Sequence, residues 1–294
     1  MPGPVVIGHD GGPSAPDALA LGLRCATLTG ARVLVAVVYP APAPIGPGRV
    51  DAEWVAERRG EAAVCLERAR EQMIAFGVPA GDVDFRAVAS TSAAHGLSDL
   101  AEAERAGLVV LGSAARGEDG RTRAGSTAHR LLHGATSPVA VAPRGTRDRR
   151  WNDPPVIGVA YVDTPEARTA LAVAADLATA AGATLRVCTV LAGEAPVLPW
   201  LIGTDAEHAF TATALDAFQG AVEAAIAGLP ERLRATGEVL RGDVVDALAE
   251  LSGVDLLVCG SRGYGPVRSV LLGGVSARLV RRARSPLVIV PRGA

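Results

Sequence analysis

The sequence predicts an α/β protein in which parallel strands alternate with helices, built as two copies of one domain. Short runs rich in Val, Leu and Ile are separated by longer helical patterns, as expected for strands that are buried on both faces of a parallel sheet. The order of these segments in the first half recurs in the second half. The length of 294 residues also suits two domains of about 150 residues better than one.

The first copy begins with a short buried strand at 4–10, which ends in a glycine-rich turn. A helix with Pro16 and Asp17 near its start follows, and the Val-rich run at 31–42 predicts the second strand. The remaining segments alternate in the same way, and we expect a helix at 54–77, a strand at 82–90, a helix at 92–107, a strand at 108–113, a helix at 127–135 and a strand at 137–145.

The same order of segments starts again at Pro155 and includes a long helix at 205–227. Matched residues support the repeat at offsets of 152 and then 148 residues: Gly30-Ala31 with Gly182-Ala183, and Gly112, Gly125 and Ser137-Pro138 with Gly260, Gly273 and Ser285-Pro286. We therefore predict domains at 1–146 and 152–294, joined through the stretch GTRDRRWNDPP.

Composition argues against several classes of function. The net charge of −2, from 29 Lys and Arg against 31 Asp and Glu, provides no field that would attract nucleic acid or an anionic membrane. The start MPGPVVIGHD has no basic leader, and no apolar run reaches the roughly 18 residues that a membrane span needs. We expect a cytoplasmic protein that contacts neither nucleic acid nor membrane. The four cysteines are isolated in apolar stretches, so disulfides are not expected.

A glycine-rich loop between an apolar strand and a helix start occurs in each half. In the second half the run LLVCGSRGYGPVRSVLLGGVS places Gly260, Gly263, Gly273 and Gly274 where the backbone must turn tightly or approach a ligand, with Ser276 as the expected N-cap of the next helix. The first half has the same arrangement in LVVLGSAARGEDGRTRAGSTA. Exposed N–H groups at such a helix start favour a phosphate.

These features together make the chain resemble tandem-domain members of the universal stress protein family. The resemblance rests on Asp10 at the end of the first strand, the strands LVVLG and LLVCG, the loop pattern G-x2-G-x9-G-[S/T], and closing strands that begin with Ser-Pro. It implies two Rossmann-like domains of the adenine nucleotide alpha hydrolase-like type, each with a five-stranded parallel sheet flanked by helices. It also suggests that the final strands, in SPVAVAP and SPLVIVP, pair within the chain as a pseudo-dimer, which would remove two apolar sheet edges. A homodimer stays open.

The resemblance further implies that ATP, with or without Mg²⁺, binds at the carboxyl ends of the strands, in agreement with the general rule for open α/β sheets. Asp10 is then expected at the base and ribose, and the loops at the phosphates. The nucleotide-binding residues expected in this way are Asp10, Gly112, Gly125, Ser126, Thr127, Asp163, Gly260, Gly263, Gly273, Gly274, Val275 and Ser276.

Each half departs from the family pattern in its own way. The first half keeps Asp10 but has Ala115 at the second loop glycine, whereas the second half keeps Gly263 but has Val162 at the Asp10 position, followed by Asp163. We expect two unequal sites, with the second loop as the stronger phosphate holder because a Cβ at the Gly263 position would crowd the ligand.

Structural explanations remain open for these residues. The glycines could serve only to let a helix pack on the sheet, Asp10 could be a turn residue, and Asp163 could cap a helix at Thr164-Pro165-Glu166. His129 and His133 share a helix face, but no third metal ligand with suitable spacing follows, so a solvated helix surface is the better interpretation.

No motif for catalysis is present, neither G-x-x-x-x-G-K-[ST] nor G-x-S-x-G, and no acidic pair flanks the loops. The leading hypothesis is therefore an ATP-binding protein with a regulatory or signalling role in stress response that is not an enzyme and hydrolyses ATP slowly at most. The alternatives are a nucleotide-free scaffold of the same fold that acts through protein contacts, and an adenylyl-transfer enzyme.

Overall fold

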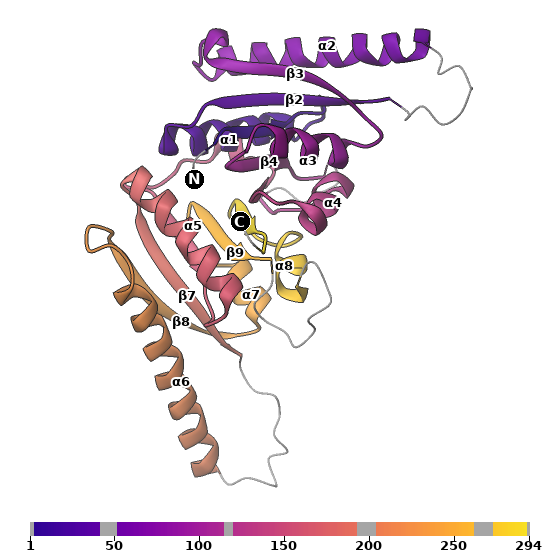
Figure 1. Cartoon of the computed structure of the whole chain (residues 1–294). Helices are drawn as coiled ribbons and strands as arrows, with labels where there is room; N and C mark the ends of the chain where they lie inside the picture. The colour runs from indigo at the N-terminus through magenta and orange to yellow at the C-terminus, as the bar shows by residue number, and fades with distance from the viewer. Residues whose placement is uncertain (1–2, 42–51, 115–119, 193–203, 262–272, 293–294) are drawn as a thin grey trace.

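The computed structural model describes residues 3–41, 52–114, 120–192, 204–261 and 273–292 (Figure 1). The first half contains β1 (Val5–Gly8), α1 (Ala15–Thr29), β2 (Val33–Pro40), α2 (Ala52–Ala75), β3 (Val83–Ser90), α3 (Ala93–Ala103), β4 (Leu108–Gly112), α4 (Ser126–Gly134) and β5 (Val139–Ala142). The second half contains β6 (Val156–Ala160), α5 (Pro165–Ala181), β7 (Thr184–Ala192), α6 (Thr204–Ala227), β8 (Ala235–Gly242), α7 (Val244–Ala249), β9 (Leu256–Gly260), α8 (Gly274–Leu279) and β10 (Leu287–Val290).

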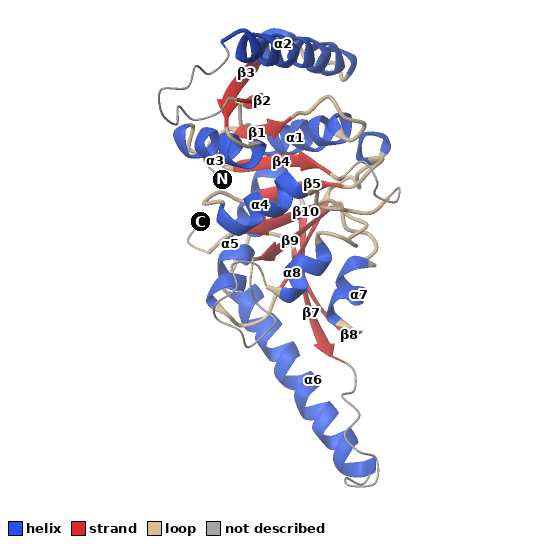
Figure 2. Ribbon diagram, turned by 90° about the vertical axis from the view of Figure 1, so that its right-hand side faces the viewer, coloured by secondary structure: helices blue, strands red, loops and turns tan. Residues whose placement is uncertain are grey.

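The strands form one sheet of ten in the order β3-β2-β1-β4-β5-β10-β9-β6-β7-β8. Within each half the five strands are parallel, as predicted. The halves meet at β5 and β10, which pair antiparallel with Val288 opposite Ala140, so the expected pairing of the final strands is confirmed. Figure 2 shows β1, β4, β5, β10 and β9 in succession through the middle of the molecule.

Strand register supports the repeat independently of sequence matching. Val5 pairs with Val33 and Leu108 in the first half, and Ile157 pairs with Leu185 and Leu256 in the second. These partners are related by the same offsets of 152 and 148 residues that the matched sequence motifs have. Because Val5 corresponds to Ile157, the register places Val162 where the first half has Asp10.

Helices cover both faces of the sheet, and alternate strand residues point to each face. Val5 and Ile7 of β1 pack in the core cluster with α1, α2, α5 and α6, whereas Val6 packs in the cluster with α3, α4, α7 and α8. The result is a three-layer arrangement in which the two longest helices, α2 and α6, lie at opposite ends of the molecule (Figure 1).

Helix ends follow local backbone chemistry. α1 and α5 both end at a left-handed glycine, Gly30 with φ of 66° and Gly182 with φ of 60°, where any other residue would be strained. α3 ends at Ala103, before the predicted limit of 107, because Arg105 takes a φ of 51° and the chain leaves the helix there. Among the described residues, no helix combines the length and apolar character needed to cross a bilayer.

Candidate functional site

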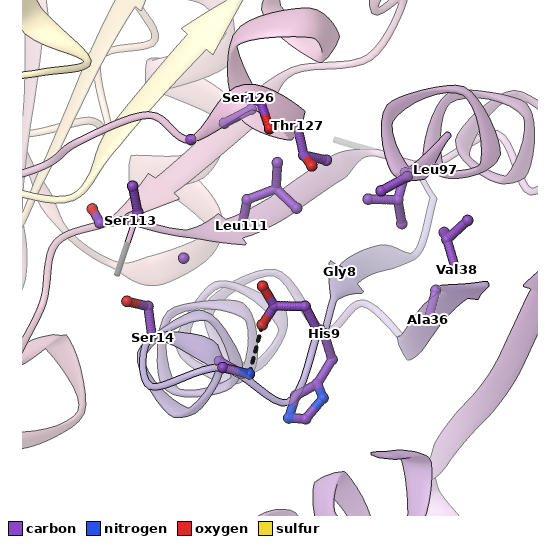
Figure 3. A pocket seen from close by; sticks show the side chains of 18 of the residues that line it. Gly8, His9, Ser14, Ala36, Val38, Leu97, Leu111, Ser113, Ser126 and Thr127 are labelled. Atoms are coloured by element: carbon purple, nitrogen blue, oxygen red, sulfur yellow. Dashed lines mark hydrogen bonds between the residues drawn. The ribbon is translucent and has the colours of Figure 1, made fainter. Parts of the chain in front are cut away.

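A pocket of about 220 Å³ lies at the carboxyl ends of β1 and β4 in the first half (Figure 3). These strands are neighbours in the sheet, and the chain leaves β1 toward β2 on one side and β4 toward β5 on the other. This is the point where the strand order reverses, at which open α/β sheets bind ligands. The pocket is lined by Asp10, Gly112, Gly125, Ser126 and Thr127, so the structure brings together every site residue expected in the first half.

One end of the pocket is apolar. Ala36 and Val38 of β2 and Leu97 of α3 lie there, as Figure 3 shows. Gly8 lets the side chains of Leu111 and Leu97 pack closely against β1, since a Cβ on it would lie 2.5 Å from Leu111 Cδ2 and 2.9 Å from Leu97 Cδ1. The apolar walls make this end suited to a flat, weakly polar group.

The other end carries polar groups. Ser14 and Ser113 lie there, with Ser126 and Thr127 of α4 nearby (Figure 3). The Ser14 hydroxyl is buried and has no hydrogen-bond partner among the described residues. A buried hydroxyl without a partner is unfavourable, so a ligand or water in the pocket would stabilise it.

Asp10 is exposed at the mouth of the pocket and is held by its own loop. The backbone N–H of Gly12 donates to Asp10 Oδ1 over 2.8 Å, a local turn that sets the orientation of the carboxylate. The turn interpretation of Asp10 is therefore correct, but it leaves the second carboxylate oxygen available to a ligand.

The start of α4 forms the wall opposite the Asp10 loop. Gly125 is the N-cap, with φ of −74° and ψ of 177°, and within the described part of the chain no side chain caps the helix. The first backbone N–H in the α4 ladder, that of His129, donates to Gly125 O over 2.9 Å, so the N–H groups of Ser126, Thr127 and Ala128 have no acceptor within the helix. Such a helix start attracts an anion.

The two first-half loop glycines have different roles. A Cβ on Gly112 would lie 2.4 Å from the backbone oxygen of Ser14, so Gly112 is needed for close packing of β4 on the start of α1. A Cβ on Gly125 would meet nothing nearer than Ala114 Cβ at 3.8 Å. Gly125 and Gly273 have φ of −74° and −67°, so neither needs the backbone freedom of a glycine. Gly112 supports the packing explanation instead.

His9, which the sequence analysis did not single out, supports the Asp10 loop from beneath. The His9 ring is buried. Its Nδ1 accepts the Gly11 N–H over 3.3 Å and lies 3.3 Å from Cys65 Sγ. Its Nε2 lies 3.2 Å from Gln72 Oε1. Burial lowers the pKa of the His9 imidazole, and the Gln72 hydrogen bond and the Asp10 charge oppose this shift only in part. The one feature of the sequence that could have indicated a role for His9 is its position directly before Asp10.

In the second half, Asp163 does not take the place of Asp10. Its carboxylate pairs with Arg168 Nη2 at 2.6 Å and accepts the Tyr161 hydroxyl over 3.2 Å. The Arg168 hydrogen bond lowers the pKa of Asp163. The helix cap expected of Asp163 is provided by Thr164, whose Oγ1 accepts from Ala167 N. Asp163 lines a groove between α5 and α6, and its charge is balanced within its own segment.

The described part of the second loop fits a structural role. Gly273 is the N-cap of α8, and its N–H donates to Ser261 O over 2.7 Å. Ser276 was predicted as the cap but lies inside α8, because its buried hydroxyl donates to Gly260 O over 2.8 Å and ties the helix to β9. Gly274 is exposed at the helix start and Val275 is buried. Gly263 and Ala115 lie outside the described residues.

The remaining polar candidates form no metal centre. His133 Nδ1 lies 2.7 Å from His129 O, and the described residues contain no group of three potential metal ligands. All four cysteines are free.

Comparison with known proteins connects both halves to one family. The model of the universal stress protein family matches residues 1–143 and 155–291. A universal stress protein of Mycobacterium tuberculosis is 29% identical over 305 residues, which covers 98% of this chain and 99% of the relative, and one of Mycobacterium bovis matches equally. A second protein of that name from Mycobacterium tuberculosis is 44% identical over 72 residues, covering 24% of this chain and 22% of the relative.

Solved structures share the complete fold. A universal stress protein from Archaeoglobus fulgidus superposes with a TM-score of 0.64 at 17% identity and full coverage of both chains. A functionally unknown protein from Pseudomonas aeruginosa has a TM-score of 0.60 at 17% identity, covering 97% of this chain and 92% of the other. At this level of identity the likeness concerns the fold.

The different roles of the two glycines predict different costs of substitution. Gly112→Ala forces a backbone clash with Ser14 and is expected to lower the free energy of unfolding by about 1–3 kcal/mol. Gly125→Ala makes only an ordinary van der Waals contact with Ala114 at an allowed φ and is expected to cost about 0.5 kcal/mol. Urea denaturation of both variants measures the difference, and equal losses would contradict the packing role of Gly112.

The buried His9 ring predicts a stability that depends on pH. Because its pKa lies below 6.5 in the folded protein, the unfolded chain takes up the proton first as the pH falls, and stability decreases below about pH 6.5. The loss from this group is at most about 1.4 kcal/mol per pH unit. Denaturation between about pH 7.5 and 5.5 should show a shallower loss for His9→Gln than for the wild type. An unchanged slope in His9→Gln would contradict this assignment.

Proposed function

Since the chain belongs to the universal stress protein family in both of its halves, we propose that it binds an adenine nucleotide, ATP above all, in the first-half pocket and acts as a regulatory protein in the response to stress. The observation that carries the proposal is the pocket itself. It joins an apolar end, the Asp10 carboxylate and an uncapped helix start at the point where the strand order reverses.

The parts of the pocket match the parts of a nucleotide. The apolar end formed by Ala36, Val38 and Leu97 suits the base, and Asp10 at the mouth suits the ribose hydroxyls as an acceptor. The N–H groups at the start of α4 suit phosphate oxygens. The buried Ser14 hydroxyl, which lacks a partner among the described residues, would gain one from the bound ligand.

The volume supports partial enclosure of the ligand. About 220 Å³ is less than the roughly 300–1,000 Å³ typical of pockets that enclose a whole small molecule. We therefore expect the base and ribose to be enclosed while the phosphates extend along the start of α4. Mg²⁺ would enter with the phosphates, because the described residues contain no group of three potential metal ligands.

The first half is the better candidate for the stronger site. Sequence reasoning favoured the second loop through Gly263, which lies outside the described residues. The described part of the second half has Val162 at the Asp10 position and an Asp163 that already pairs with Arg168. The available carboxylate at the end of the first strand is thus present in the first half and missing at this position in the second.

The regulatory role follows from what the pocket offers chemically. His9 and Asp10 are the titratable side chains among the described residues that line it. The His9 ring is engaged by Gly11 and Gln72, and in the proposed mode of binding Asp10 contacts the ribose rather than the phosphates. A cytoplasmic protein that binds ATP without a placed general base would transmit occupancy to a partner rather than turn over substrate.

Replacement of Asp10 should weaken ATP binding. Asp10→Ala removes a charged acceptor for the ribose, and we expect affinity to fall about 10- to 100-fold, since such hydrogen bonds contribute about 1.5–3 kcal/mol. Isothermal titration calorimetry on the full chain measures this change. Asp163 directly follows Val162, the second-half counterpart of Asp10. Asp163→Ala is therefore the matched control, and it should leave the affinity of the tighter site unchanged.

Two results would count against this assignment. An equal loss of affinity in both variants would mean that the stronger site is not in the first half. If the wild-type chain binds no ATP at millimolar concentration and releases no nucleotide on denaturation, the alternative of a nucleotide-free scaffold is favoured.

Turnover of bound ATP should be slow. Without a base or a protein-held metal beside the phosphates in the described pocket, we expect hydrolysis well below about 1 per second, the low end of ordinary enzyme rates. Phosphate release from the purified chain measures the rate. Faster hydrolysis that is lost in Asp10→Ala would show that the protein is an enzyme, whereas activity that survives this change points to a contaminant.

A further inference from the structure

A short segment of the first half, residues 121–124, crosses to the second half and lies along the end of α8. We call it the crossing segment. The N–H of Thr122 donates to Ala283 O over 2.7 Å and that of Ala124 donates to Val280 O over 2.8 Å. The Thr122 hydroxyl, which is completely buried, donates to Leu279 O over 3.0 Å.

These bonds have a specific physical basis. The last carbonyl groups of a helix lack donors within the helix and need partners from elsewhere. Val280 O and Ala283 O, just after α8, accept from the crossing segment in this way. Leu279 O accepts from the Thr122 hydroxyl in addition to the N–H groups of Arg282 and Ala283. These contacts hold this part of the first half against the second half.

An ion pair at the surface reinforces the contact. Arg121 donates to Arg282 O over 2.9 Å and pairs with Glu250 Oε1 at 2.7 Å, directly after α7. Both side chains are partly exposed, so the pair contributes less than the buried Thr122 bonds.

The same segment is bonded to the wall of the pocket. Ala114 N donates to Arg123 O over 2.7 Å, and Arg123 N donates to Ser113 Oγ over 3.0 Å. Ser113 and Ala114 line the pocket, and Gly125, the N-cap of α4, follows the crossing segment directly in the chain. A continuous set of hydrogen bonds therefore runs from α8 of the second half to the pocket of the first half.

We propose that the second half positions the nucleotide site of the first half through the crossing segment, with Thr122 as the main positioning residue. This inference rests on the proposed function, because it concerns the affinity of that same pocket. Residues of the second half that never touch the nucleotide then set its affinity, and bound nucleotide in turn holds the crossing segment against α8. If the crossing segment served only to join the two halves, changing it would lower the stability of the protein and leave the ATP affinity of the folded protein unchanged.

Substitutions at Thr122 test the proposal. Thr122→Val keeps the shape of the side chain and removes the hydroxyl that donates to Leu279 O, and Thr122→Ser keeps the hydroxyl. We expect ATP affinity of the full chain, measured by calorimetry, to fall about fivefold in Thr122→Val, corresponding to about 1 kcal/mol, and to stay near the wild-type value in Thr122→Ser. Glu250→Gln, an exposed change in the second half, should weaken binding about twofold.

Hydrogen exchange provides a readout that a purely structural role would not move. At an ATP concentration just sufficient to saturate the wild type, ATP should slow the exchange of the Thr122 and Ala124 amides in the wild type and in Asp163→Ala, and much less in Asp10→Ala. If wild-type protein binds ATP while Thr122→Val and Glu250→Gln bind equally well and exchange is unaffected, the positioning role is refuted and the proposed function stands. If wild-type protein binds no ATP, the proposed function fails and this inference fails with it.

Discussion

The antiparallel pairing of β5 with β10 is the interaction on which the rest of the molecule depends. Each of these strands is fully buried, and each would be an apolar sheet edge if its half stood alone. Their pairing turns two five-stranded sheets into one of ten and brings α1 against α5. It also brings the crossing segment to the end of α8, so the site of one half is built beside the other half.

The two halves share one scaffold but differ in the residues at the ends of their strands. Corresponding strands keep the same partners at the same offsets, and both first helices end at a left-handed glycine. The polar residues at the strand ends did not remain the same: His9 and Asp10 correspond to Tyr161 and Val162. Packing constrains the scaffold through many contacts at once, whereas a ligand constrains only the few residues that touch it.

Glycines illustrate how one residue type can serve two purposes in one loop. A side chain at Gly112 would clash with the backbone of Ser14, whereas one at Gly125 would make only an ordinary contact with Ala114, although both glycines appear in the same sequence pattern. The pattern shows that a side chain is absent but does not show whether protein or ligand fills the space. That distinction matters for every glycine-rich loop that is interpreted as a phosphate site.

Local patterns in the sequence determined the repeat, the alternation of strands and helices, and the parallel sheets. They also placed Asp10 at the end of a strand and Ser126 at the start of a helix. Such patterns suffice because hydrophobic periodicity and helix caps act over a few residues. Only the tertiary structure decided that His9 is buried against Gln72 and that Asp163 forms an ion pair with Arg168. It also decided that Ser276 donates to Gly260 rather than capping α8, and that the Thr122 hydroxyl donates to Leu279. The contacts of His9, Ser276 and Thr122 join atoms that are 63, 16 and 157 residues apart, and periodicity does not report which atoms meet over such separations. Asp163 and Arg168 are near neighbours in sequence, but only the folded backbone shows that their side chains face each other.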